Sequence, residues 1–279
     1  MADGHGGVLA IVDGHSLCRR SSDGDWTEIA KSEFDLSCCV PIGNVVFVGT
    51  DDAQILRAGP DGALQRLTGF DAVEGRDKWY AGSAIIDGKR VGPPLGIRSM
   101  TATCDGAVLL ANVHVGGVPR STDSGLTWQP TIDIDSDVHQ VCAHPIRPDI
   151  VIAASAVGLC VSRDAGMTWT IEQRGLHALH CSAVAFGRDD IFVSASVDPF
   201  AAQGAVYRRP IDSDGPLQPL GGGMPQWTDG KVDTDCIATR DSMAAVIDRS
   251  GRLYVSHDDG AYWTIPLDRL PVPSGLHIC

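Results

Sequence analysis

The chain has 279 residues, 32 of them glycine, and its formal net charge of −13 opposes binding to nucleic acids or anionic membranes, which are themselves negatively charged. No apolar run is long enough for a membrane-spanning helix, and the first residues lack the charged and apolar pattern of a secretion signal. We therefore expect a cytoplasmic protein with neither a nucleic-acid nor a membrane partner.

Short apolar runs separated by turn residues follow one another along the chain, which is typical of consecutive antiparallel strands. The N-terminal part supplies three such runs, and each later group supplies four. We expect these groups to be sheets, or blades, of one domain that covers residues 1–279. The blades have these limits: blade 1 at 8–30 with 275–279, blade 2 at 35–68, blade 3 at 96–132, blade 4 at 137–172, blade 5 at 180–219 and blade 6 at 233–267.

One connection, residues 69–95, is far longer than a usual inter-strand loop. Loops of this length in compact domains are usually lids, binding loops or disordered segments. Because this one is rich in aromatic and charged residues, we interpret it as a functional insertion on the face that carries the site. A second long connection, residues 220–232, contains three consecutive glycines and Trp227.

An eight-residue motif, Ser-x-Asp-x-Gly-x-(Thr/Tyr)-Trp, occurs at residues 121–128, 162–169 and 256–263. In such a sequence the Asp and Ser side chains can accept hydrogen bonds from nearby backbone N–H groups, and Gly allows a positive φ. The Trp then buries a large apolar surface between neighbouring sheets. We therefore assign a structural role to six residues: Asp123, Trp128, Asp164, Trp169, Asp258 and Trp263.

The motif resembles the Asp box, or bacterial neuraminidase repeat (BNR), of sialidases, sortilin-type receptors, photosystem II assembly factors and many bacterial β-propellers. The resemblance implies an all-β propeller whose boxes lie on the outer rim, between the third and fourth strands of a blade, away from the binding face. It does not carry over sialidase catalysis. Sialidases use three arginines and a Tyr–Glu pair, whereas here Arg98 is the only arginine on an innermost strand.

Following the repeat along the chain gives a six-bladed β-propeller of four-stranded antiparallel blades. The first blade lacks an innermost strand at the N-terminus, and residues 275–279 align with the innermost strands of the other blades. We expect this C-terminal segment to join the three N-terminal strands and close the ring. Ring closure protects sheet edges that would otherwise pair with other chains.

In a propeller the innermost strands begin at one face of the central channel, and the loops between second and third strands reach the same face. This alignment brings four histidines together, which we predict as metal ligands: His114, His139, His180 and His277. Imidazole nitrogens and carboxylate oxygens suit a divalent ion such as Zn, Mn, Fe or Ni. Asp233 or Asp235 would be a further ligand or the general base.

Arg98 would bind a substrate carboxylate, because its guanidinium pairs with two oxygens at once, and we count it with the catalytic residues. Lys78, Trp79, Tyr80 and Trp227 are predicted to contact the substrate from the two long connections. These residues together indicate an enzyme with its site in the central funnel, a metal-assisted hydrolase or lyase acting on a small polar or anionic molecule.

Two other functions fit the same sequence. One is a non-catalytic propeller scaffold, or assembly factor, that binds a protein partner. The other is a carbohydrate-binding or glycosidase-like protein, which would present exposed tryptophans along a groove. Metal content, and the effect of His139→Ala on activity or stability, distinguish the enzyme from these alternatives.

Overall fold

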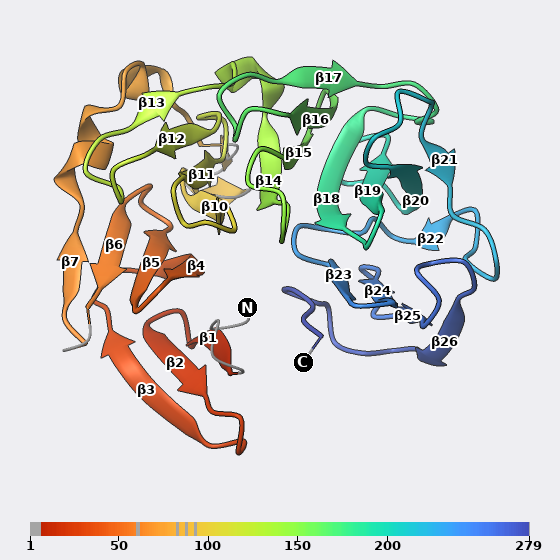
Figure 1. Ribbon diagram of the computed structural model, residues 1–279, viewed down its shortest axis with the longest axis horizontal. Coiled ribbons are helices and arrows are strands. Elements are labelled where there is room, and N and C mark those ends of the chain that lie inside the picture. Colours follow the sequence, from red (N-terminus) through yellow and green to blue (C-terminus); the bar gives the residue numbers. More distant parts are fainter. Residues whose placement is uncertain (1–6, 60–61, 82–83, 87–88, 92–93, 279) are drawn as a thin grey trace. The chain divides into compact units, whose positions relative to one another are not determined.

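The computed structural model describes residues 7–59, 62–81, 84–86, 89–91 and 94–278. They form an all-β structure with three short 3₁₀ helices, η1 (Thr68–Ala72), η2 (Arg76–Lys78) and η3 (Ile134–Ser136) (Figure 1). No helix among them is long and apolar enough to span a membrane. The chain divides into two compact units: unit one has residues 1–151, 162–169 and 279, and unit two has residues 152–161 and 170–278.

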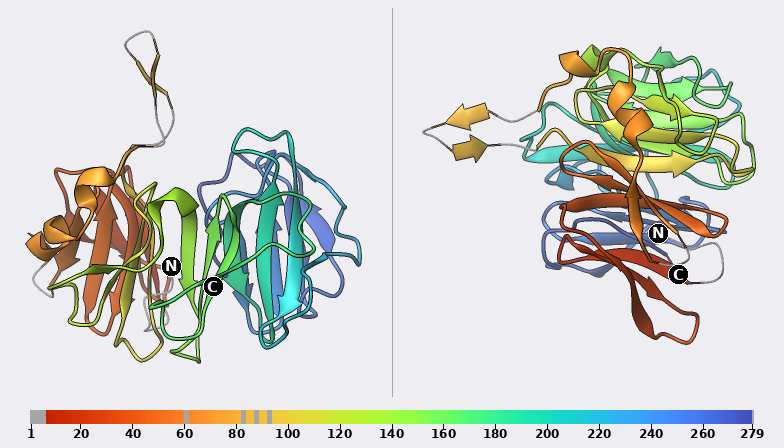
Figure 2. Two further views of the ribbon diagram at one scale, coloured as in Figure 1. Left: turned by 90° about the horizontal axis from the view of Figure 1, so that it is seen from above. Right: turned by 90° about the vertical axis from the view of Figure 1, so that its left-hand side faces the viewer.

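Unit one contains three complete antiparallel sheets and one separate hairpin. The sheets are β1 (Val8–Val12), β2 (Ser16–Arg20) and β3 (Trp26–Lys31); β4 (Leu36–Ile42), β5 (Val45–Thr50), β6 (Ile55–Ala58) and β7 (Leu64–Arg66); and β10 (Ile97–Ala102), β11 (Leu109–Val113), β12 (Pro119–Ser121) and β13 (Gln129–Pro130). The hairpin pairs β8 (Ala84–Ile86) with β9 (Lys89–Val91) (Figure 2). It lies within the long connection after β7, where no strand was predicted.

The remaining sheets follow the same order along the chain. One contains β14 (Val138–Ala143), β15 (Val151–Ser155), β16 (Gly158–Ser162) and β17 (Thr170–Glu172). The next contains β18 (His180–Phe186), β19 (Asp190–Ser196), β20 (Gln203–Pro210) and β21 (Gln218–Pro219), and β22 (Thr228–Asp229) also pairs with β20. The last contains β23 (Ile237–Arg240), β24 (Met243–Ile247), β25 (Leu253–Ser256) and β26 (Thr264–Leu267). The predicted succession of antiparallel sheets is therefore confirmed, while the blade limits and the single domain stay predictions.

Aromatic side chains organise the core of each unit. In unit one, Phe70 meets the edge of Trp128 at 5.0 Å and Trp79 at 5.6 Å. In unit two, Phe192 lies edge-to-face against Trp263 at 6.5 Å. Buried aromatic pairs of this geometry add about 0.5–1.5 kcal/mol to the area they bury. Trp128 and Trp263, which end the first and third repeats, thus pack against a core phenylalanine of their unit.

The first Ser-x-Asp-x-Gly repeat shows how the turn is closed. Ser121 Oγ donates to Asp123 Oδ1 at 2.8 Å and accepts the backbone N–H of Gly125 at 2.9 Å. The Asp123 carboxylate also accepts the backbone N–H and the hydroxyl of Thr127, at 2.9 and 2.6 Å. Gly125 has a φ of 84°, and its carbonyl accepts the indole N–H of Trp128 at 2.9 Å. The side chains of Ser121 and Asp123 together close this left-handed turn.

The other two repeats close in the same way, with the serine-to-aspartate bond at 2.8 Å in each. Trp263 again donates to the carbonyl of the glycine in its own repeat, Gly260, at 3.0 Å. Trp169 differs, because it is only half-buried and its indole N–H donates to Thr131 Oγ1 at 3.1 Å. The structural role assigned to the three repeats agrees with these contacts.

The C-terminal segment requires a correction. Residues 275–279 were expected to form an innermost strand, but their described part has no strand, and β1–β3 remains a three-stranded sheet. Instead, the backbone N–H of Leu276 donates to the carbonyl of Asp235 at 2.7 Å. Pro271 and Pro273 lie just upstream, and proline cannot donate to a strand ladder. The segment after them is too short to establish a register of its own.

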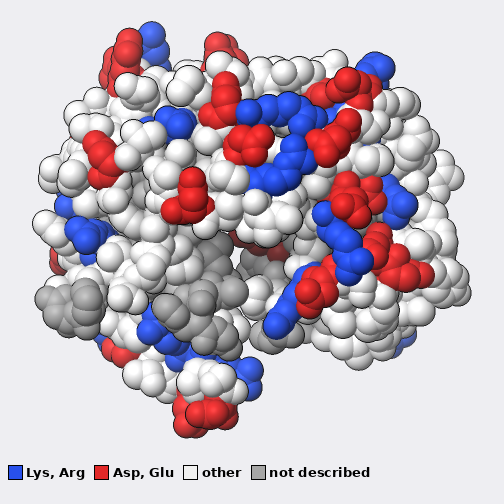
Figure 3. All heavy atoms as spheres, viewed as in Figure 1, with Lys and Arg blue, Asp and Glu red and all other residues white. Residues whose placement is uncertain are grey.

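Charged side chains of both signs are mixed on the face shown in Figure 3. Lysine and arginine atoms lie next to aspartate and glutamate atoms there, and no continuous basic surface is visible among the described residues of that face. Exposed pairs such as Arg188 with Asp259, at 3.8 Å, are of this kind. Pairs of this type contribute little to stability because water screens them.

Candidate metal centre

His114 is held at the end of the most completely buried strand of its sheet. Every residue of β11 is buried, and the chain then turns sharply, with Val115 at a φ of 48°. The backbone N–H of His114 donates to the carbonyl of Gly96 at 3.1 Å. Only 5% of His114 is exposed. A polar ring fixed in this position needs polar partners, because burial without them costs several kcal/mol.

Asp137 and His139 come from the start of β14. Asp137 ends η3 in a left-handed conformation, with φ 44° and ψ 74°, and the strand begins at the next residue. Asp137 thus lies just outside β14, and His139 is the second residue of that strand. His139 is 3% exposed, whereas the side chain of Asp137 keeps 32% of its surface exposed. The Asp137 carboxylate therefore contacts the buried ring of His139 on one side and solvent on the other.

The three side chains converge within unit one. His114 Nε2 lies 3.5 Å from Asp137 Oδ1, and His139 Nε2 lies 3.5 Å from Asp137 Oδ2. One ligand atom from each residue can be chosen so that all three lie within 4.8 Å of one another. A tetrahedral Zn²⁺ with bonds of about 2.0–2.1 Å needs ligand atoms about 3.3–3.4 Å apart. These three residues could therefore hold a metal ion after small side-chain adjustments.

Charge favours a carboxylate in its ionised form at this position. Burial raises the pKa of Asp137, but its hydrogen bond with His139 and the positive charges of His139, His114 and Arg98 together bring the pKa below its usual value. Asp137 Oδ1 is itself buried and has no hydrogen-bond partner among the described residues. An ionised oxygen with unused acceptor capacity, next to two imidazoles, suits a divalent cation.

The sequence predicted part of this group. His114 and His139 were both proposed as ligands, and the structure brings them together; Arg98 lies on β10 and acts electrostatically on Asp137. Asp137 was missed. Strand alternation does not predict it, because Asp137 lies before β14 in a left-handed conformation.

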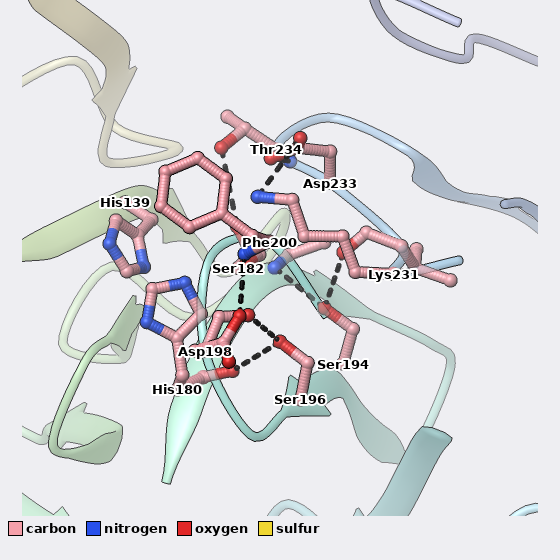
Figure 4. A network of polar contacts seen from close by, with 12 residues as sticks. His139, His180, Ser182, Ser194, Ser196, Asp198, Phe200, Lys231, Asp233 and Thr234 are labelled. Carbon is pink, nitrogen blue, oxygen red and sulfur yellow. Dashed lines mark hydrogen bonds and ion pairs between the residues drawn. The ribbon is translucent and has the colours of Figure 1, made fainter. Parts of the chain in front are cut away.

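The other predicted ligands lie in unit two. Asp233 pairs with Lys231, with 3.1 Å between Oδ2 and Nζ, and its Oδ1 accepts the backbone N–H of Thr234 (Figure 4). His180 is half-buried on β18, and its carbonyl accepts the hydroxyl of Ser196 at 3.5 Å.

Asp235 has a left-handed φ of 59° next to the C-terminal segment, in which His277 is exposed. Within the described part of the chain, no group of three ligands other than His114, Asp137 and His139 comes within the same distances. The roles predicted for Asp233, Asp235, His180 and His277 therefore remain predictions.

The predicted substrate contacts fall into two classes. Trp79 is a correction: it is 8% exposed and belongs to the core with Phe70, so its ring cannot cover a ligand. Arg76 also stacks on it, with the guanidinium carbon 4.9 Å from the ring centre. Lys78 and Tyr80 are exposed, as is Trp227 in unit two.

Comparisons with known proteins identify a fold. No family model matches the chain, and no curated protein matches it in sequence. Among solved structures, a GH74 xyloglucanase from Xanthomonas campestris matches with a TM-score of 0.61 and 18% identity over 94% of this chain and 44% of its own. A virginiamycin B lyase from Staphylococcus aureus matches with a TM-score of 0.65 and 11% identity, over 97% of this chain and 87% of its own.

PorZ of Porphyromonas gingivalis, a surface component of the type-IX secretion system, matches with a TM-score of 0.62 and 12% identity over 98% of this chain and 33% of its own. The chain spans less than half the length of the GH74 proteins it matches. These structures are propeller-like, and this chain shares their β-propeller fold. Identities this low show the fold alone, since one fold supports many functions.

Proposed function

We propose that the protein is a metal-dependent enzyme of the hydrolase or lyase class, with its metal held by His114, Asp137 and His139. The observation that carries the proposal is the convergence of two buried imidazoles on the two oxygens of one carboxylate. The presence of a hydrolase and a lyase among the propeller structures supports the reaction class at a coarse level. Two histidines and one carboxylate leave positions open for water and substrate.

Each residue has a distinct task in this proposal. His114 and His139 are neutral nitrogen ligands, and Asp137 supplies the negative charge that a divalent ion requires. A bound Zn, Mn, Fe or Ni ion would polarise a substrate oxygen or lower the pKa of a bound water. Arg98, whose charge already acts on Asp137, would orient a small anionic substrate through its guanidinium.

The finer assignments belong to the same proposal. We infer that the chain is a six-bladed propeller of the Asp-box type, supported by the three repeats with one hydrogen-bond pattern. We infer a cytoplasmic protein that acts on a small molecule and not on nucleic acids or anionic membranes, supported by its formal net charge of −13.

Metal content tests the proposal directly. The purified protein is stripped with a chelator, reconstituted separately with each of the four ions, and subjected to elemental analysis. We expect about one ion per chain for the native protein and much less for His139→Ala. His257→Ala is the matched control, because His257 is exposed and belongs to the third repeat.

Activity is then measured on small esters, lactones and carboxylate elimination substrates. Metal-dependent turnover that is lost in His139→Ala and retained in His257→Ala supports the enzyme. A native protein that binds none of the four ions overturns the proposal, and a bound ion without turnover on any substrate favours the scaffold.

A further inference from the structure

Unit two contains a second candidate site, separate from the residues of the metal centre. A cavity of about 500 Å³ opens near the end of β19. This volume lies within the range of small-molecule pockets. The cavity is lined by His177, Val197, Ala201, Ala202, Gln203, Trp227 and Asp229.

Backbone pairing holds two walls of the cavity in place. β22 pairs with β20 so that Asp229 lies opposite Gln203, and the N–H of Gly230 donates to the carbonyl of Ala202 at 2.8 Å. The backbone N–H of Asp229 also donates to the fully buried carboxylate of Asp248 at 3.2 Å. The position of Asp229 is therefore fixed by the fold before any ligand binds, which lowers the entropy cost of binding.

His177 and Trp227 form another wall. Their rings meet edge-to-face with centres 4.8 Å apart, and 40% of Trp227 stays exposed. The hydroxyl of buried Tyr207 accepts the backbone N–H of His177 at 3.2 Å and lies 2.7 Å from its Nδ1. The Tyr207 hydroxyl thus fixes the orientation of the His177 ring through two hydrogen bonds. Desolvation lowers the pKa of His177, so the imidazole is neutral at neutral pH.

The lining residues combine apolar surface with a single formal charge. Four of the seven are Val, Ala or Trp, one carries a carboxylate, and none is Lys or Arg. Asp229 interacts electrostatically with Arg252, which does not line the cavity. A cation in this cavity would be attracted both by the carboxylate of Asp229 and by the indole ring of Trp227.

We propose that this cavity binds a small organic cation with an apolar body, its ammonium group at Asp229 and its body against Trp227. Titration calorimetry with benzylammonium chloride tests the proposal, with benzyl alcohol as the neutral probe of similar shape. We expect benzylammonium to bind at least tenfold more tightly than benzyl alcohol. Asp229→Asn and Trp227→Ala are each expected to weaken its binding about tenfold or more.

Controls separate the cavity from the general negative charge of the protein. Asp241→Asn removes the charge of a side chain that is 90% exposed, and Trp26→Ala removes an exposed indole of unit one; both variants are expected to bind like the native protein. Asp229→Glu keeps the charge and is expected to retain most of the affinity. Thermal unfolding of each variant verifies that it is folded.

Three outcomes would overturn the proposal. The first is equal affinity for benzylammonium and benzyl alcohol, and the second is unchanged affinity in Asp229→Asn. The third is binding of a neutral sugar, methyl glucoside, in preference to benzylammonium, which would assign the cavity to carbohydrate instead. None of these measurements depends on a metal at His114, Asp137 and His139, so the cavity and the proposed enzyme can fail independently.

Discussion

Asp137 is the residue on which the metal centre depends, because its two carboxylate oxygens face different buried imidazoles. Without a metal, the Asp137 carboxylate hydrogen-bonds to His139, and its other oxygen lies 3.5 Å from Nε2 of His114. With a metal, the carboxylate would balance part of the ion's charge. The carboxylate must be ionised both with and without the metal. The hydrogen bond with His139 and the neighbouring positive charges favour this form, because they lower the pKa of Asp137.

Replacement of Asp137 by asparagine tests this dependence. The substitution keeps the size of the side chain but removes its charge and replaces one acceptor oxygen with an N–H donor. We expect metal affinity, measured by competition with a chromogenic chelator, to fall by about a hundredfold or more, since loss of an outer-sphere partner alone costs 10- to 100-fold. Asp135→Asn changes an exposed carboxylate two residues away and is expected to bind like the native protein. Affinity within threefold of native for Asp137→Asn would contradict the assignment.

At the scale of the element, each Ser-x-Asp-x-Gly turn ties its own stability to pH. Hydrogen bonds from Thr127 lower the pKa of Asp123, and a backbone N–H from Tyr262 lowers the pKa of Asp258. A carboxyl whose folded pKa lies below its unfolded value stabilises the protein at pH values above the unfolded pKa, about 3.9 for Asp. That stability is lost as the pH falls through the folded pKa.

Acid unfolding of turn variants measures this contribution. We expect the free energy of unfolding, from urea titrations between pH 7 and pH 3, to decrease below about pH 4 in the native protein. In the double variant Asp123→Asn/Asp258→Asn this decrease should be smaller, because two groups no longer take up protons. Asp241→Asn, an exposed aspartate outside the turns, should keep the native slope. The same slope in all three proteins would contradict the role of the turns.

The third turn also depends on a glycine from the long connection before it. Gly222 has a φ of 61°, and its carbonyl accepts the backbone N–H of Trp263 at 2.6 Å. A β-carbon at Gly222 would lie 1.8 Å from the carbonyl oxygen of Ala261, so only glycine allows this approach. Gly43 has a similar φ of 58° but open space around it.

The two glycines therefore form a matched pair. We expect Gly43→Ala to cost about 1–2 kcal/mol, the ordinary cost of a left-handed alanine, and Gly222→Ala to cost about 4 kcal/mol or more. Urea unfolding gives both values. Equal losses in the two variants would mean that the connection moves away from the turn without cost, and the close packing inferred here would be wrong.

At the scale of the whole molecule, local features were predictable and distant ones were not. The Ser121–Trp128 turn could be predicted because all its partners lie within eight residues. His114 and His139 could be placed by strand alignment. Asp137 is itself a left-handed residue that ends a 3₁₀ helix, and no strand or repeat period predicts its position. Trp79 was misassigned because its partners, Phe70 and Arg76, bury it inside a loop that is polar in sequence.

The pairing of complete sheets was predictable for the same reason, since each strand pairs with the next one along the chain. The ends of the chain were harder, because a terminal strand must find a partner that is distant in sequence. Residues 275–278 showed the apolar pattern of a strand and yet bond to the turn at Asp235. In a segment this short, the apolar pattern does not distinguish a fourth strand of the β1–β3 sheet from an irregular segment that bonds to a turn.

The most direct test of the metal centre is anomalous diffraction from crystals soaked with Zn²⁺. We expect one strong anomalous peak, about 2.0–2.1 Å from a ring nitrogen of both His114 and His139 and at bonding distance from Asp137. The peak should disappear in Asp137→Asn crystals and persist in Asp135→Asn crystals. No peak at these three residues in well-soaked crystals, or a zinc ion bound only by other histidines, would contradict the assignment of the metal centre.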